Sequence, residues 1–277
     1  MESQCAYYKP KTLKEAVRLL GDRKRNNVIL AGGSFLALTN RSTLEGLVDI
    51  TGLGLRGIRE TKTAFVIGAT TTMKDLQESR PLGRFAGGIL AAAAANYSTT
   101  LVRNTATLGG VLIEATGFAD VVAALLAFDT RLRIVGKKER MVSLDEFCAG
   151  NPFELLGKGI IKEIRVIKPK GKVWAGYERL AKTKADISII SVSASVQKTG
   201  QKVGVARIVA GGVDLAPVRF RAAEQIIVEG GLDERTIAKA AAAAKQECPV
   251  TDDLRASGEY RQWMCEVLVR RVLSKLR

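Results

Sequence analysis

The chain has 277 residues, of which 47% are hydrophobic, so it is long enough to bury a substantial core and to form two domains. It contains no histidine, which excludes Ser-His and Cys-His catalysis, histidine-ligated metals and a flavin attached through histidine. The formal net charge of +15 permits nucleic-acid binding, but the basic residues are dispersed and aromatic residues make up only 5%. A solvated surface, or a face that meets an acidic partner subunit, is therefore favoured.

Cysteine spacing and hydropathy bear on whether the protein binds a metal through cysteine or spans a membrane. Cys5, Cys148, Cys248 and Cys265 are widely separated and form no C-x-x-C pair, which predicts isolated reduced thiols rather than a zinc or iron–sulfur site. No apolar run approaches the roughly 20 residues that cross a bilayer. The first residues, Met1–Gln4, lack the charged-then-apolar order of a secretory signal, so we expect a cytoplasmic protein without membrane contact.

The first informative stretch is an apolar strand that runs into two glycines. A capping box at Thr12–Glu15 begins a short helix that Gly21 ends, and the strand Val28–Leu30 then leads to Gly32 and Gly33. Such a turn can present backbone amides to a phosphate, although an ordinary strand-to-turn junction has the same pattern. The chain contains neither G-x-G-x-x-G nor the P-loop motif, so any nucleotide must be bound by another geometry.

Further elements follow in order along the first half of the chain. Residues 47–50 form a second predicted strand, which makes residues 1–55 a small β-α-β-like lobe. Residues 64–67 predict a strand, and residues 72–77 predict a capped short helix. The alanine-rich segment 82–95 predicts one buried helix that tolerates two glycines.

A second Gly-Gly pair closes a polar, hydroxyl-rich stretch at residues 97–110 and predicts a second turn. An apolar helix over residues 118–127 follows it and carries one acid, Asp120. This carboxylate can favour the positive end of the helix, or it can accept hydrogen bonds from a ribose, and both roles can coexist.

The pattern changes near Lys168–Lys172, which contains Pro and Gly and predicts a domain boundary. Strands are expected before it at residues 132–135 and 160–167. Beyond it we expect three antiparallel strands at 174–180, 187–196 and 203–209, and then helices near 219–228, 234–244 and 259–275. The predicted domains are residues 1–170, with lobes 1–55 and 56–170, and residues 171–277.

Two Gly-Gly turns, the second preceded by Arg-Asn-Thr-Ala-Thr and followed by an acid-bearing apolar helix, are more specific together than either is alone. This arrangement resembles the FAD-binding medium subunit of the molybdenum hydroxylases, which include xanthine dehydrogenases and carbon monoxide dehydrogenase. Tyr177–Arg179, Lys184–Ile187 and Gly258–Arg261 resemble the C-terminal domain of that family, so the likeness covers nearly the whole chain.

The resemblance implies an α+β protein. Its first part is a two-lobed FAD-binding fold of the vanillyl-alcohol oxidase type, and its second part is a C-terminal α+β domain with a three-stranded antiparallel sheet and helices. FAD would be bound non-covalently, while the molybdenum cofactor and the [2Fe–2S] clusters would lie on partner subunits.

The resemblance also implies a set of cofactor-binding positions. The first turn would wrap the pyrophosphate with backbone amides, and the second would close on it from the other lobe. Tyr97 would pack on the adenine, Asp120 would be the ribose-side acid, Ile161 would lie by the flavin ring and Arg179 would take the place of a lysine that reaches the ring. The full set is Ile29, Leu30, Ala31, Gly32, Gly33, Ser34, Phe35, Leu36, Tyr97, Thr107, Leu108, Gly109, Gly110, Val111, Asp120, Ile161 and Arg179.

Three positions depart from the family pattern. Phe35 and Val111 stand where the family commonly has polar residues, so their side chains cannot supply two polar contacts to the cofactor. Arg179 keeps the positive charge of the lysine but presents a planar fork of donors.

The function that the resemblance implies is electron transfer within an oxidoreductase complex. A large molybdenum-cofactor subunit would hydroxylate the substrate, for which family membership suggests xanthine or another purine, and a small iron–sulfur subunit would relay electrons. FAD on this chain would pass them to NAD⁺ or another acceptor, with no catalytic side chain of its own. The alternatives are a stand-alone flavin-dependent oxidase of the vanillyl-alcohol type, which would need a base that the sequence does not reveal, and a basic nucleic-acid-binding protein.

Overall fold

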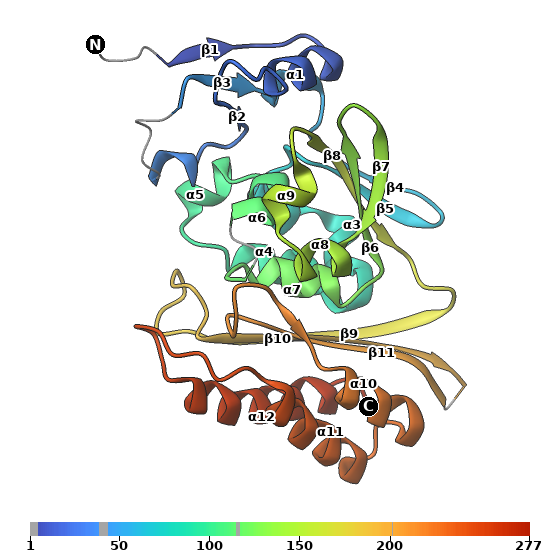
Figure 1. Cartoon of the computed structure of the whole chain (residues 1–277). Helices are drawn as coiled ribbons and strands as arrows, with labels where there is room; N and C mark the ends of the chain where they lie inside the picture. The colour runs from blue at the N-terminus through green and yellow to red at the C-terminus, as the bar shows by residue number, and fades with distance from the viewer. Residues whose placement is uncertain (1–4, 39–43, 115–116, 201) are drawn as a thin grey trace.

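The computed structural model describes residues 5–38, 44–114, 117–200 and 202–277, so Met1–Gln4 lie outside the described part. In these residues the strands form three sheets, with the N-terminal sheet at the top of Figure 1 and the C-terminal sheet at the bottom. The α+β class that the sequence predicts is confirmed, with a C-terminal antiparallel sheet covered by helices.

The first sheet is parallel and has the strand order β1-β3-β2, with β1 Ala6–Tyr8, β2 Asn27–Leu30 and β3 Gly46–Asp49. Helix α1 (Leu13–Leu20) begins at Thr12, whose hydroxyl accepts a hydrogen bond from the Glu15 amide, and ends at Gly21 as expected. The buried side of α1 packs its apolar residues against this sheet and leaves the opposite side in solvent. The short 3₁₀ helices η1 (Leu36–Leu38) and η2 (Thr51–Leu53) follow β2 and β3.

The central sheet is antiparallel, in the order β4-β5-β8-β6-β7. Its strands are β4 Ile58–Glu60, β5 Ala64–Gly68, β6 Thr130–Val135, β7 Glu139–Ser143 and β8 Ile160–Ile167. The strands expected at 64–67, 132–135 and 160–167 are present, whereas β1, β4 and β7 were not predicted. Each of these three is short, and none has the apolar alternation of a half-buried strand.

Helices lie around the central sheet and between it and the C-terminal sheet (Figure 1). They are α2 Met73–Glu78, α3 Arg80–Arg84, η3 Phe85–Gly88, α4 Ile89–Ala95, α5 Thr100–Thr105, α6 Leu108–Glu114, α7 Asp120–Leu126, α8 Leu144–Ala149 and α9 Pro152–Leu156. The capped helix expected at 72–77 is α2, in which Thr72 and Asp75 form a reciprocal capping box.

The single helix predicted over residues 82–95 is wrong. The chain breaks at η3, where Ala86, Gly87 and Gly88 all have positive φ angles of 48°, 70° and 71°. A Cβ on Gly87 would lie 2.8 Å from the Ala175 carbonyl oxygen, so the break also lets β9 approach closely. A second correction concerns Gly109 and Gly110, which lie in the first turn of α6 rather than in a loop.

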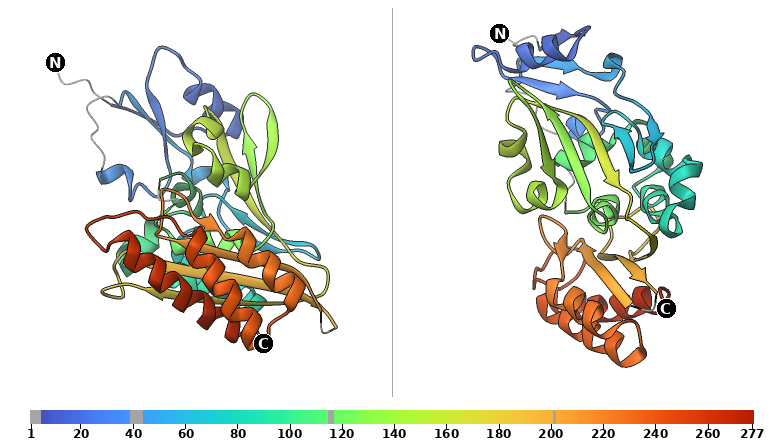
Figure 2. Two further views of the ribbon diagram at one scale, coloured as in Figure 1. Left: turned by 60° about the horizontal axis from the view of Figure 1, so that its bottom comes forward. Right: turned by 90° about the vertical axis from the view of Figure 1, so that its right-hand side faces the viewer.

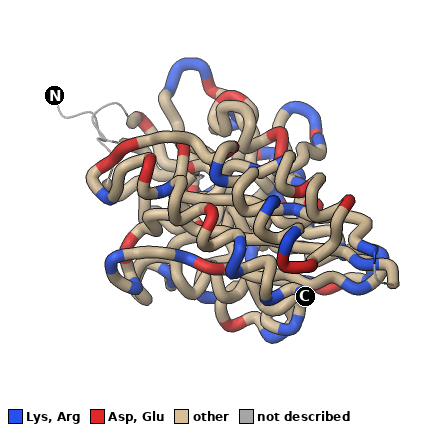
Figure 3. The backbone as a smooth tube through the Cα atoms, turned by 90° about the horizontal axis from the view of Figure 1, so that it is seen from below, with Lys and Arg blue, Asp and Glu red and all other residues tan. Residues whose placement is uncertain are grey.

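The C-terminal part is an antiparallel sheet in the order β12-β11-β10-β9, with the C-terminal helices on one face. It has the three predicted strands and a fourth, the two-residue β12, which was not predicted. Its elements are β9 Lys172–Leu180, β10 Ile190–Thr199, β11 Lys202–Gly211, β12 Val218–Arg219, α10 Arg221–Gly230, α11 Glu234–Glu247 and α12 Gly258–Ser274. Figure 2 shows α10, α11 and α12 on the outer face, while α7 packs on β10 and β11 from the inner face. Over the outer layer, Lys and Arg are interspersed with Asp and Glu (Figure 3).

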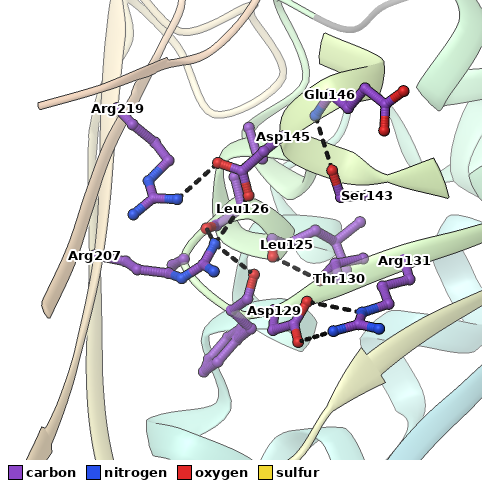
Figure 4. A network of polar contacts seen from close by, with 12 residues as sticks. Leu125, Leu126, Asp129, Thr130, Arg131, Ser143, Asp145, Glu146, Arg207 and Arg219 are labelled. Carbon is purple, nitrogen blue, oxygen red and sulfur yellow. Dashed lines mark hydrogen bonds and ion pairs between the residues drawn. The ribbon is translucent and has the colours of Figure 1, made fainter. Parts of the chain in front are cut away.

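Asp145, in the first turn of α8, joins the central part to the C-terminal sheet (Figure 4). Its carboxylate accepts hydrogen bonds from Arg219 Nη1 at 2.7 Å and Arg207 Nη1 at 3.0 Å, and Arg221 Nη2 lies 3.1 Å away. Burial alone would raise the pKa of Asp145, but the hydrogen bonds and charges of Arg219 and Arg207 outweigh it, so this pKa is lowered. The stabilising contribution is therefore present at neutral pH and is lost as the pH falls through the lowered pKa.

We expect Asp145→Asn to reduce the free energy of unfolding by about 2 kcal/mol at pH 7, because it removes the charge that Arg207 and Arg219 share. The difference from the unmodified chain should shrink as the pH falls, since acid also neutralises Asp145 itself. Urea unfolding at several pH values measures the free energy of unfolding of the variant and of the unmodified chain. Asp129→Asn is the matched control, because Asp129 pairs with Arg131 at the exposed surface and should cost less than about 0.5 kcal/mol. Equal losses for both variants would contradict the prediction.

Candidate flavin site

A cavity of about 540 Å³ lies between the first sheet and the central part of the chain. Its size falls within the roughly 300–1,000 Å³ that small-molecule sites occupy. The loop after β2 forms one wall, and α6 with the segment that precedes β8 forms another. Most of the lining is apolar, and Glu114 and Lys158 are the only charged side chains among the described residues that line it.

The loop after β2 carries the donors that an anion would need. No described group accepts a hydrogen bond from the backbone amides of Gly32, Gly33, Ser34 or Phe35, and all four residues line the cavity. Gly33 has a φ of +68°, which a residue with a side chain rarely adopts. Free amides in a glycine loop are a good match for a cofactor pyrophosphate, so this wall fits FAD.

Gly32 fixes the loop against the opposite wall. A Cβ at this position would lie 1.9 Å from the Thr105 carbonyl oxygen, which is closer than any real contact. The backbones of the two walls therefore touch here, and glycine is required for that approach.

The second Gly-Gly pair differs from the first, because its amides are already used. The amides of Leu108 and Gly109 each donate at 2.8 Å to carbonyl oxygens of Thr71 and Ala69, and Gly110 donates to the Thr107 hydroxyl at 3.3 Å. A Cβ on Gly109 would lie 3.0 Å from the Ala69 side chain. This pair therefore lets α6 pack tightly on Ala69 and shapes the cavity, and it does not supply free amides.

Thirteen of the predicted site residues line this cavity, and four do not. The lining includes Ile29, Ala31, Gly32, Gly33, Ser34, Phe35, Leu36, Tyr97, Thr107, Gly109, Gly110, Val111 and Ile161. Leu30 and Leu108 are adjacent to these in the chain, and Leu108 is fully buried. Asp120 and Arg179 belong to a separate polar network.

That network connects α7 to the C-terminal sheet. The Asp120 Oδ2 atom accepts hydrogen bonds from the Tyr177 hydroxyl at 2.5 Å and the Ser188 hydroxyl at 2.8 Å, and Arg179 Nε lies 3.2 Å away. Arg179 also donates to the carbonyl oxygens of Lys184 and Asp186. Burial and the neighbouring Asp120 carboxylate raise the pKa of Tyr177, so its phenol stays protonated.

Several cavity residues were missed at the sequence level. They include Asn26 just before β2, Asn27 at its start, Glu114 at the end of α6, Phe153 in α9 and Lys158 just before β8. A weak signal existed for Lys158, which stands between two glycines just before a predicted strand. Glu114 could not be predicted as a cavity residue, because nothing in its local sequence indicates that it faces a cavity.

Among the described residues, no cluster of His, Cys, Asp or Glu could hold a metal ion. All four cysteines are free thiols. Within the same residues, every helix is too short or too polar to span a bilayer.

Comparison with known proteins identifies the two parts of the chain. Residues 2–169 match a family described as the FAD binding domain in molybdopterin dehydrogenase, and residues 175–276 match the CO dehydrogenase flavoprotein C-terminal domain. The carbon monoxide dehydrogenase medium chain of Hydrogenophaga pseudoflava is 31% identical over 97% of this chain and 95% of its own length. The alpha subunit of the 6-hydroxypseudooxynicotine dehydrogenase complex of Paenarthrobacter nicotinovorans is 30% identical over 95% and 91%. A solved carbon monoxide dehydrogenase from Hydrogenophaga pseudoflava matches with a TM-score of 0.89 and 30% identity over 99% of this chain and 97% of that one.

We expect Gly32→Ala to weaken FAD binding roughly 10- to 100-fold, because overpacking of about 1–3 kcal/mol would push the two walls apart. Fluorescence quenching of FAD titrated with the apoprotein measures the affinity. Gly52→Ala is the control, since the nearest atom to its added Cβ would be Lys9 Cε at 3.8 Å, and it should bind FAD as the unmodified chain does. Tight binding by Gly32→Ala would contradict this account of the loop.

Glu114 should make FAD affinity depend on pH. Burial raises the pKa of Glu114, and no described side chain pairs with it. Its carboxylate forms as the pH rises through this raised pKa and then repels the negatively charged pyrophosphate, so affinity should fall by about threefold to tenfold. Titrations of FAD between pH 4.5 and 8 test this. Glu114→Gln should flatten the profile, whereas Glu78→Gln on the exposed side of α2 should leave it unchanged.

Proposed function

This chain belongs to the FAD-binding medium subunits of the molybdenum hydroxylases, and we propose that it passes electrons from [2Fe–2S] clusters through FAD to NAD⁺ or another acceptor. In this family FAD binds to the medium subunit, while molybdenum and iron–sulfur cofactors belong to partner subunits. The partners are therefore a large molybdenum-cofactor subunit and a small iron–sulfur subunit.

The observation that carries the proposal is the loop of free amides at one wall of the cavity. Four neighbouring residues, 32–35, offer amides without described partners, and glycine at two of them permits close approach. We assign the pyrophosphate to this loop. Thr107 to Val111 would close the cavity from the opposite side by shape, because the amides of residues 108–111 are committed to the protein.

The remaining positions supply orientation and electrostatics. When bound, FAD supplies a redox centre that accepts and releases electrons, while the protein sets its position and surroundings. Ile161 and Tyr97 would hold planar groups by apolar contact. The ribose-side role of Asp120 and the flavin-side role of Arg179 stay predictions, since neither residue lines the cavity. Phe35 and Val111 contribute apolar surface where the family commonly has polar groups. At Phe35 the free backbone amide would carry the contact, whereas the Val111 amide already donates to the Thr107 carbonyl oxygen.

The substrate is a property of the partner subunit. Relatives of this chain serve enzymes named for carbon monoxide and for 6-hydroxypseudooxynicotine, so this subunit type accompanies different substrates. A purine such as xanthine is one possibility that we propose. We further propose a cytoplasmic protein with domains at 1–170 and 171–277, and no role in nucleic-acid binding.

The test follows reduction and reoxidation of FAD on this chain when its partner subunit and an acceptor are added. Mixed with FAD, the purified chain should bind one equivalent and develop the flavin absorption band. Addition of the prereduced iron–sulfur subunit should bleach that band, and NAD⁺ should restore it if NAD⁺ is the acceptor. Restoration only by an artificial dye would exclude NAD⁺ and leave another acceptor. A chain that acquires no flavin band would overturn the proposal.

A further inference from the structure

The N-terminal lobe carries an exposed group of cations, of which only Arg25 donates a side-chain hydrogen bond to another described residue, the Tyr8 hydroxyl at 2.7 Å. Residues 9–25 contain seven Lys or Arg and only two acids, and six of the cations define what we call the basic patch: Lys11, Lys14, Arg18, Arg23, Lys24 and Arg25. All six are exposed. In the part of the chain that the structure describes, none of the six forms an ion pair with a carboxylate.

Local structure accounts for only one of these charges, Arg18, which lies in the last turn of α1 where the helix dipole favours a cation. Lys11 precedes α1 and Lys14 lies in its first turn, where the helix dipole disfavours a cation. Arg23, Lys24 and Arg25 are consecutive in the loop between α1 and β2, so their charges repel one another. The outer C-terminal layer is different, because its basic residues lie among acidic ones (Figure 3).

The basic patch adjoins the cofactor cavity. Its loop runs directly into Asn26 and Asn27, and both of these residues line the cavity. Helix α1 lies beside the N-terminal sheet at the top of Figure 1, remote from α11 and α12. A protein bound to the patch would therefore sit beside the bound cofactor.

The patch favours a protein over a nucleic acid as its partner. Two acids lie within it, Glu15 and Asp22, and their carboxylates are fixed by the amides of Lys11 and Lys24 at 2.8 and 3.0 Å. Fixed negative charges would repel a continuous phosphate backbone, whereas a protein face can pair with both signs. An iron–sulfur cluster held by four thiolates adds negative charge to the subunit that carries it.

We propose that the basic patch docks an acidic face of the small iron–sulfur subunit beside the FAD cavity. This inference rests on the proposed function, since it names the surface through which that partner approaches. Opposite charges would steer the encounter and hold the two redox centres close together.

The test compares two triple charge reversals in the FAD-loaded full chain. Lys14→Glu with Arg18→Glu and Lys24→Glu alters the patch, and Lys137→Glu with Lys138→Glu and Lys170→Glu makes the same change at exposed sites elsewhere. Binding to the purified iron–sulfur subunit is measured at 50 and 500 mM NaCl. The patch variant should bind about tenfold or more weakly at low salt and match the unmodified chain at high salt, while the control variant stays within about threefold.

Equal weakening by both variants, or none by the patch variant, would overturn the docking proposal and leave the proposed function intact. If the unmodified FAD-loaded chain fails to bind the iron–sulfur subunit at either salt concentration, the proposed function fails and the docking proposal with it. A labelled 20-base-pair duplex is titrated in parallel. Loss of duplex binding in the patch variant, with subunit binding unchanged, would assign the patch to nucleic acid instead. An unchanged FAD absorption band in both variants shows that the cavity is intact.

Discussion

The close approach of two backbones at Gly32 and Thr105 is the constraint on which the cavity depends. Any side chain at Gly32 would overlap the Thr105 carbonyl oxygen, so only glycine lets the loop after β2 cross against the start of the opposite wall. Because the loop is held there, its next three residues cannot pair with the first sheet. Their amides remain free at the cavity wall, and the binding surface follows from a steric requirement.

Two identical dipeptides perform different physical tasks here. The first Gly-Gly pair includes a left-handed residue and leaves its amides free, whereas the second lies in the first turn of a helix and donates its amides to Ala69 and Thr107. An anionic group in the cavity therefore faces donors mainly on one side. The opposite wall contributes shape, since Gly109 lets α6 lie directly on Ala69. The two turns therefore cannot contribute equal numbers of amide hydrogen bonds to a pyrophosphate.

Elements with a strong pattern of their own could be predicted from the sequence, including β8, β9, α11 and α12, because alternation or helical periodicity already defines their buried face. The prediction of one helix over residues 82–95 was wrong because alanine favours a helix wherever it occurs. The break in the helix comes from the close packing of Gly87 against Ala175, which is distant in the sequence. Glu114 and the partners of Asp145 were beyond prediction for the same reason. Their neighbours lie far away in the sequence, and only the folded arrangement brings them together.

Asp120 has a structural task that its sequence context did not indicate, because its carboxylate anchors α7 to the C-terminal sheet. Its Oδ2 atom carries all three contacts to Tyr177, Ser188 and Arg179, which tie the start of α7 to the C-terminal sheet. Its Oδ1 atom has no partner among the described residues. A structural anchor that uses one oxygen leaves the other able to accept a hydroxyl hydrogen bond. A ribose contact through Oδ1, as we propose, would then depend on this anchor, since a shift of the C-terminal sheet would also move Asp120, which itself lies outside the cavity lining.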